Sequence, residues 1–221
     1  MRPVRVTVGP LVAASANNIV TTGTPVSGTA LTLNGTLVPV AGGPAVLDTP
    51  RRVLLTFGSE AAARTMVVTG TSRGGQTQTE TLIIPITTVG TVATVLDYAT
   101  VTSLLPLGSG WTAAATVGTN GVAASAWVNF DEYAMPQISI QCNVTGTVNY
   151  TIQQTLDTAS VDSGNTEASF VWINSPDSNV VGATSSQQSN YAYMPKWARV
   201  LLNSGSGSVT ATFIQSSVAP Y

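Results

Sequence analysis

Few residues of this chain could carry catalytic or metal-binding chemistry. The 221-residue sequence contains no histidine and a single cysteine, Cys142. Without imidazole there is no Ser-His-Asp or Cys-His triad and no histidine-based metal site, and one cysteine can form neither an intrachain disulfide nor a zinc cluster. Cys142 alternates in phase with Ile138 and Ile140, so we expect a buried, unreactive thiol.

Carboxylates are the remaining candidates for acid–base chemistry. A glycosidase needs two carboxyl groups about 5 to 10 Å apart across the scissile bond. Asp131 and Glu132 are adjacent and would face opposite sides of a strand, whereas Glu80 and Asp97 fall in separate strands. The sequence therefore predicts a protein that is not an enzyme and has no catalytic residues.

One acidic loop has the composition of a cation site. Asp157, Asp162, Asn165 and Glu167 surround Gly164, and hard cations prefer oxygen ligands. Their spacing does not match an EF-hand, and Asx-rich loops more often cap their own turns. We expect no metal and no cofactor, and we leave open whether the loop Asp157–Glu167 binds a cation.

The charge of the chain is low. It has 8 basic and 10 acidic residues, a formal net charge of −2, and charged residues make up 8% of the total against about 25% in typical globular domains. No basic block could follow a phosphate backbone, and we interpret the pair Arg51–Arg52 as a solvated strand entrance, so nucleic acid is not an expected partner. A weakly charged, threonine-rich surface suits a protein that packs against copies of itself or against partners.

No membrane span is expected. The most apolar tract, Leu82–Leu107, is broken by Pro85, Gly90 and Asp97, and a spanning helix needs about 20 consecutive apolar residues.

Period-two alternation of β-branched residues dominates the chain and predicts an all-β fold of antiparallel strands. Strands at 65–70 and 76–84 flank a Gly-rich turn and predict a hairpin, and strands at 197–202 and 209–215 predict a closing hairpin. The turn Thr119–Gly121 and the small-residue run after it mark a boundary. We expect two β-sandwich or jelly-roll-like domains, residues 1–122 and 123–221.

A polar row lies beside an apolar one in the segment 148–155. Val148, Tyr150 and Ile152 alternate with a row of Asn149, Thr151 and Gln153, so the two rows face opposite sides of a strand. The polar row faces either water or another subunit. We expect Thr151→Arg to be nearly neutral for folding, within about 0.5 kcal/mol, as surface changes usually are.

Two long segments and one aromatic group are candidate contact regions. The segments Ala13–Pro50 and Asp157–Tyr193 are polar and poor in strand signals, and we interpret them as arms that contact neighbouring subunits. The aromatic residues Tyr191, Tyr193 and Trp197 form either core or an interface, with a sugar-stacking platform as a further alternative.

Several stretches resemble small β-rich virion structural proteins of tailed bacteriophages, and the resemblance spans most of the chain. They include Ala30–Gly35, Arg51–Val53, Val67–Gly75, Thr79–Leu82, Val117–Gly121, Gly146–Gln153, Ala198–Val200 and Gly205–Thr210.

The resemblance implies a non-enzymatic virion component, assembled in the bacterial host cytoplasm. It would be an accessory protein that decorates or cements the capsid, or that lies at the head-to-tail collar. Its partners would be copies of itself and other virion proteins of the capsid, portal or tail. The alternatives from the residues are a host-surface glycan-binding or tail adhesion module, and a depolymerase that uses carboxylates.

Overall fold

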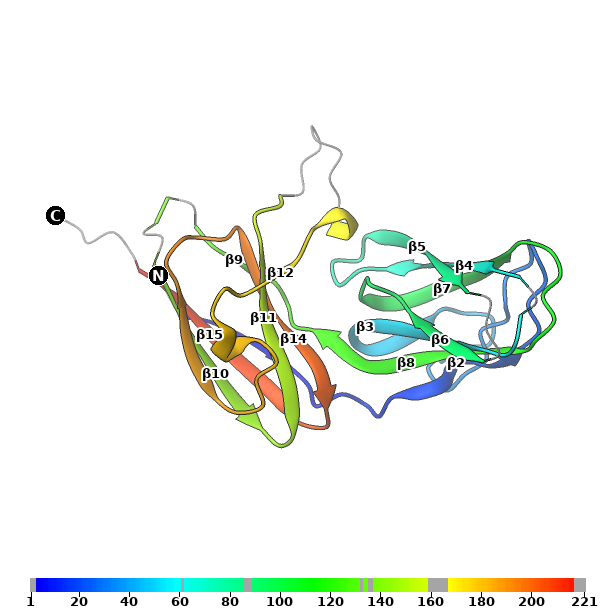
Figure 1. Cartoon of the computed structure of the whole chain (residues 1–221), viewed down its shortest axis with the longest axis horizontal. Helices are drawn as coiled ribbons and strands as arrows, with labels where there is room; N and C mark the ends of the chain where they lie inside the picture. Colours follow the sequence, from blue (N-terminus) through cyan, green and yellow to red (C-terminus); the bar gives the residue numbers. More distant parts are fainter. Residues whose placement is uncertain are drawn as a thin grey trace. The chain divides into compact units, whose positions relative to one another are not determined.

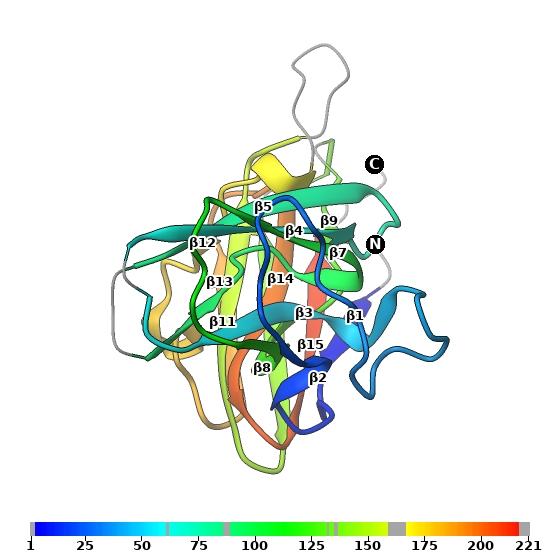
Figure 2. The same ribbon diagram turned by 90° about the vertical axis from the view of Figure 1, so that its right-hand side faces the viewer.

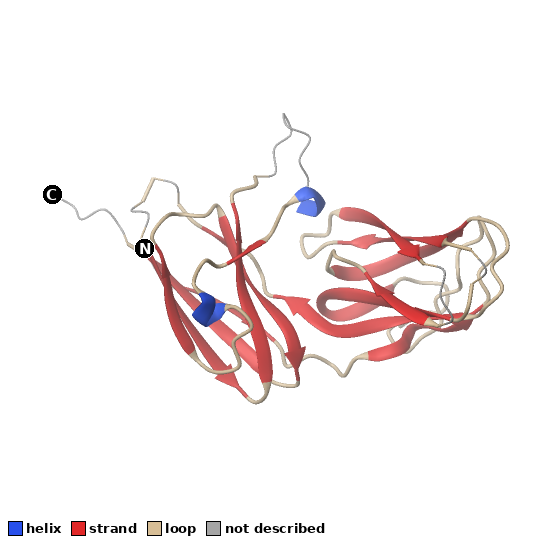
Figure 3. Ribbon diagram, in the orientation of Figure 1, coloured by secondary structure: helices blue, strands red, loops and turns tan. Residues whose placement is uncertain are grey.

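The chain is built from antiparallel β-strands, as predicted (Figures 1 and 3). The computed structural model describes residues 3–60, 62–85, 89–131, 133–134, 137–158 and 167–216. The strands are β1 (Val4–Val8), β2 (Ser15–Gly23), β3 (Ala45–Phe57), β4 (Arg64–Thr71), β5 (Thr77–Ile84), β6 (Gly90–Ala93), β7 (Tyr98–Leu107), β8 (Ala115–Ala124), β9 (Val128–Asn129), β10 (Ile138–Thr145), β11 (Val148–Thr155), β12 (Ile173–Asn174), β13 (Gln187–Tyr191), β14 (Trp197–Gly205) and β15 (Ser208–Gln215). Two short 3-10 helices, η1 (Glu167–Ser169) and η2 (Ser178–Val180), complete the described elements.

The chain divides into two compact units. Unit 1 comprises residues 1–11 and 122–221, and unit 2 comprises residues 12–121. The division after residue 121 lies one residue from the expected boundary, but residues 1–11 belong with the C-terminal part, which corrects the expected N-terminal domain of 1–122. The reason is strand pairing, because β1 forms an antiparallel ladder with β15 from Val4 opposite Phe213 to Val8 opposite Val209.

Unit 1 is a sandwich of two sheets around one core. One sheet has the order β1-β15-β10-β13, and facing it are β12, β11 and β14, with β9 and the last residues of β8 also paired to β14. Alternation places Ile140 and Phe213 of the first sheet against Tyr150, Ile152 and Val200 of the second, all at most 2% exposed. Strand alternation thus supplies both walls of the core.

Cys142 lies in this core and is fully buried, as predicted. Burial raises the pKa of its thiol to about 11, since the thiolate would lose its hydration. The thiol therefore stays protonated at neutral pH.

The predicted closing hairpin is wrong, although both of its strands exist. β14 pairs with β11, while β15 pairs with β10 and β1 in the opposite sheet. The turn between β10 and β11 likewise joins strands of different sheets. In a sandwich a short turn can cross from one sheet to the other, and side-chain alternation alone does not distinguish this arch from a hairpin.

Unit 2 is formed around a strand path β8-β3-β7-β4-β5 (Figure 2), with β2 paired to β8 and β6 paired to β3. The predicted hairpin is present, because β4 and β5 pair in register from Arg64 opposite Ile84 to Thr71 opposite Thr77. Its turn is closed by the Ser72 N–H donating to the Gln76 carbonyl at 2.8 Å. The core contains Val53, Met66 and Leu104, each at most 1% exposed.

The segment Ala13–Pro50 is not an arm, which corrects that prediction. Leu31 and Leu33 are buried in the core of unit 2, and the Leu31 N–H donates to the Leu104 carbonyl at 2.9 Å. The Leu37 N–H likewise donates to the Asn18 carbonyl at 2.8 Å. A few apolar side chains among Gly, Pro and Thr residues are enough to hold this segment to its own unit.

Candidate functional site

The polar row of β11 is covered by its own chain. Thr151 is 4% exposed, and its hydroxyl oxygen accepts from Gly182 N–H and from Asn203 Nδ2, both at 3.0 Å. Asn149 Nδ2 donates to the Gly182 carbonyl at 3.1 Å, and Asn149 Oδ1 accepts from Asn203 at 2.7 Å. The expectation that this row faces water or a neighbouring subunit is therefore wrong at Thr151, and with this burial we expect Thr151→Arg to destabilise the fold.

Gln153 at the end of the row is also engaged within the chain. Its Oε1 accepts from Arg199 Nε at 3.0 Å and Nη2 at 2.9 Å, and its Nε2 donates to Asn174 Oδ1 at 3.1 Å. Asn174 belongs to β12, which pairs with β11. The described part of the predicted arm Asp157–Tyr193 thus packs on unit 1 and covers the row together with Arg199 and Asn203 of β14.

The three predicted aromatic residues do not form one platform. Tyr191 of β13 is 1% exposed in the core, and burial raises the pKa of its phenol. Its ring lies 6.1 Å from that of Tyr193, which is 45% exposed and whose hydroxyl accepts from Gln154 Nε2. Trp197 makes its ring contact elsewhere, with Trp127 at 6.2 Å. An interface or sugar-binding role for Tyr191 is excluded by its burial.

A tryptophan cluster in unit 1 was not predicted. The Trp127 ring lies 5.1 Å from Trp172 and 5.4 Å from Phe170, in addition to its contact with Trp197. The guanidinium carbon of Arg199 lies 4.2 Å from the centre of the Trp172 ring, a cation–π distance. The three indoles are partly exposed. The sequence signal is the position of three of the chain's four Trp residues after residue 122, but their contacts join segments far apart in sequence.

The candidate carboxylates are used to hold loops. Glu80 accepts through its two oxygens from the N–H groups of Val95 at 2.8 Å and Leu96 at 3.0 Å. Glu60 is 2% exposed and accepts from Ala113 N–H at 3.2 Å. Both carboxylates thus serve as acceptors for backbone N–H groups of unit 2. Glu60 was not among the carboxylates proposed from the sequence. Of the other proposed ones, Asp97 lies directly before β7, Asp131 accepts from the Tyr133 N–H at 3.0 Å, and Glu132 lies outside the described residues.

The acidic loop Asp157–Glu167 lies mostly outside the described residues. Its first member, Asp157, accepts through Oδ2 from Val171 N–H at 2.6 Å and from the Thr155 hydroxyl at 3.1 Å. Across residues 3–60, 62–85, 89–131, 133–134, 137–158 and 167–216, no group of three or more Cys, Asp or Glu side chains is placed to hold a metal ion.

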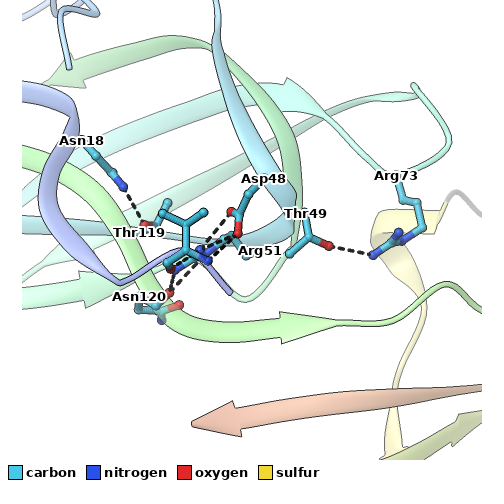
Figure 4. Close-up of polar contacts among 8 residues, drawn as sticks. Asn18, Asp48, Thr49, Arg51, Arg73, Thr119 and Asn120 are labelled. Carbon is cyan, nitrogen blue, oxygen red and sulfur yellow. Dashed lines mark hydrogen bonds and ion pairs between the residues drawn. The ribbon is translucent and has the colours of Figure 1, made fainter. Parts of the chain in front are cut away.

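Arg51 lies inside unit 2, which corrects its interpretation as a solvated strand entrance (Figure 4). It is 1% exposed, and Nη1 donates to the Val12 carbonyl and to Asp48 Oδ1, both at 2.9 Å. Its Nε donates to the Asn120 carbonyl at 3.2 Å. Val12 and Asn120 stand at the two ends of unit 2, so one buried guanidinium fixes the points where the chain enters and leaves this unit.

The outward side of β4, β5 and β7 carries no charged side chain. Register places Thr71 between Thr77 and Thr100, and Thr69 between Thr79 and Ser103. We call this surface the neutral face, and its residues are Thr65, Val67, Thr69 and Thr71 of β4, Thr77, Thr79, Thr81 and Ile83 of β5, and Thr100, Ser103, Leu105 and Leu107 of β7.

One end of the neutral face carries two exposed apolar side chains, Ile83 and Leu107. Thr65 lies between Ile83 and Leu107, and Ile83 is 67% exposed while Leu107 is 38% exposed. Among the described residues, the only strand that pairs with β5 is β4. The one charged residue of β5, Glu80, bonds to backbone on the side away from this face. The arrangement can make backbone, hydroxyl and methyl contacts, but no ion pair.

Comparison of the chain with protein-family models, with curated proteins and with solved structures found no match. In the part of the chain that the structure describes, no helix has the length and apolar character that crossing a membrane requires.

Proposed function

We propose that this chain is a non-enzymatic structural component of a tailed-bacteriophage virion. It acts as an accessory β-sandwich protein that assembles symmetrically on the capsid as a decoration or cement protein, or at the head-to-tail collar. The observation that carries the assembly role is the neutral face of unit 2. The assignment to a virion rests on the sequence resemblance.

The neutral face favours contact with other copies because the outward side of its edge strand carries no charged side chain. Free monomers protect their edge strands with charged side chains, above all lysine, or with proline or a covering loop. β5 carries Thr79, Thr81 and Ile83 outward instead, each exposed. A neutral surface repels a copy of itself weakly, and its hydroxyl and methyl groups are self-complementary.

The mechanism is mechanical. An edge strand can pair with the same strand of a second copy across a two-fold axis, which extends the sheet and gives an isologous contact. For β5 this pairing would use the strand's outer backbone groups, with Ile83 and its threonines burying surface beside them. This contact joins copies in pairs, and a shell or ring then needs a second contact from each copy to a neighbour or to the particle surface.

A virion location is testable on particles. Heads of the phage that encodes the chain, emptied of DNA, should take up the purified protein to a saturating ratio in a sedimentation assay. Replacing Thr79 and Thr81 together by lysine should reduce uptake, because it places charge on the neutral face. Thr91→Lys, at an exposed threonine of β6, is the matched control and should bind as the wild type does. Uptake that fails to saturate, or that ignores all of these changes, would contradict the proposal.

A second candidate is a host-surface glycan-binding or tail adhesion module, and the tryptophan cluster favours it. Trp172 and Trp197 each contact Trp127, and all three are partly exposed. Exposed indoles stack on sugar rings. Binding to immobilised host glycans that is lost in Trp172→Ala, and retained in the Thr79 and Thr81 lysine variant, would support this candidate over the first.

A further inference from the structure

The N-terminal strand β1 belongs to unit 1 by pairing but is joined to it only through unit 2. β1 pairs with β15 at the edge of the sheet β1-β15-β10-β13. The chain then leaves unit 1 after Leu11 and returns at Val122. All other strands of unit 1 lie in the continuous stretch after that return. β1 can therefore leave the sheet without interrupting any other ladder of the unit.

The contribution of β1 to unit 1 is substantial. Val6 and Val8 are 9% and 3% exposed within the core, and Val4 and Leu11 pack against it. Burial of apolar side chains stabilises the folded state, so these side chains hold β1 on β15. The outward side chains add a hydrogen bond between the hydroxyls of Thr7 and Thr210 at 2.9 Å.

The connection from β1 to unit 2 is short and is fixed at both ends. Gly9 packs against Gly207 of unit 1, since a Cβ at Gly9 would clash with the Gly207 carbonyl oxygen. Val12 is fixed in unit 2, because its carbonyl accepts from Arg51 and its N–H donates to Asp48 Oδ2 at 2.9 Å. Residues 9–14 have no regular secondary structure. Only Pro10 and Leu11 lie between these two fixed points, and Leu11 packs against the core of unit 1.

We propose that β1 of one copy occupies the β15 edge of a second copy, so that exchanged N-terminal strands join neighbouring subunits. This inference rests on the proposed function, because it requires copies held close together in an assembly. The contacts between β1 and β15 are the same whether the two strands belong to one chain or to two, so exchange loses no strand contact. The balance between the exchanged and the unexchanged form then depends on the connection after β1 and on the local concentration of copies. Strand exchange would give each joint the strength of a buried core contact in addition to the weak contacts of the neutral face.

Paired cysteines test the exchange directly. Thr7 and Thr210 are opposite residues in the ladder, and opposite residues of antiparallel strands lie within disulfide range. We co-express two copies that differ in length, so that a gel separates their products, and oxidise them mildly. One copy carries Thr7→Cys and the other Thr210→Cys. We expect a disulfide between the two copies. The wild type should give none, because Cys142 is buried.

A collision control and a mass measurement complete the test. Thr7→Cys co-expressed with Thr91→Cys should give no such product, because Thr91 lies on β6 in unit 2. A variant that carries both Thr7→Cys and Thr210→Cys in the same chain tests whether β1 stays on the β15 of its own chain. An oligomer by light scattering in which this variant forms only the intrachain disulfide would overturn the exchange and leave the proposed function standing. A single-chain mass with only the intrachain disulfide would overturn both.

Discussion

The guanidinium of Arg51 donates to the carbonyl oxygen of Val12 at 2.9 Å inside unit 2. The same side chain bonds to Asn120 and Asp48, so it ties together the two ends of the unit. Replacing it by methionine would leave two carbonyls and a carboxylate without this donor. We expect Arg51→Met to lower the free energy of unfolding of unit 2 by about 3 kcal/mol.

Hydrogen exchange measured by mass spectrometry distinguishes the units in this variant. Protection should fall in residues 12–121 and stay near the wild-type value in residues 137–158. Arg5→Met, at an exposed arginine of β1, is the control and should change little. Equal loss of protection in both units would contradict the conclusion that Arg51 stabilises only unit 2.

Thr151→Arg should destabilise unit 1. The site is 4% exposed, and the threonine hydroxyl accepts two hydrogen bonds that an arginine cannot accept. The loss of these bonds and the burial of a charge should cost about 2 to 4 kcal/mol. Thr145→Arg at the exposed end of β10 should cost less than about 0.5 kcal/mol. Urea unfolding followed by tryptophan fluorescence measures both, and equal midpoints would show that the cover over Thr151 opens freely.

Gly9→Ala should loosen β1. Gly9 has φ +80° and its Cβ would clash with Gly207, whereas Gly75 has φ +79° and no atom within 4 Å of its Cβ position. Both substitutions carry the strain of a positive φ, about 1 kcal/mol or more, but only Gly9→Ala adds the clash. We expect Gly9→Ala to be the more destabilising by at least about 1 kcal/mol, with faster hydrogen exchange in β15. Equal effects of the two changes would mean that Gly9 is not seated on the turn before β15.

Alkaline pH should weaken unit 1 through Cys142. Burial raises the pKa of this thiol to about 11 in the folded chain, against about 8.5 in an unfolded one. The stability linked to the protonated thiol is complete below about pH 8.5 and is lost as the pH rises through 11, because only the unfolded chain ionises between these values. Over this range the free energy of unfolding should fall more steeply in the wild type than in Cys142→Ala. Parallel pH profiles would contradict the burial of the thiol.

Local sequence signals predicted much of the fold. Alternation identified many of the strands, the inward side of β10 and the hairpin of β4 and β5, but it missed β2 and β13 in the segments interpreted as arms. The same signals could not separate a hairpin from an arch. β14 and β15 are joined by a short turn but pair with β11 and β10, and that choice depends on contacts distant in sequence.

The candidate site was harder to predict for the same reason. Alternation placed Thr151 opposite the core correctly, but its cover comes from Gly182 and Asn203, more than 30 residues away. Arg51 resembles a surface residue in the sequence because its acceptors at Val12 and Asn120 are 39 and 69 residues away. The neutral face emerges only when the register of three strands is known.

The most direct test of the assembly role is the mass of the purified protein by light scattering over a range of concentrations. We predict a defined multiple of the 22.6 kDa chain, shifted toward the single chain when Thr79 and Thr81 are both replaced by lysine and unchanged in Thr91→Lys. A mass of one chain at every concentration, with or without these substitutions, would contradict the proposal that the neutral face joins copies of this protein.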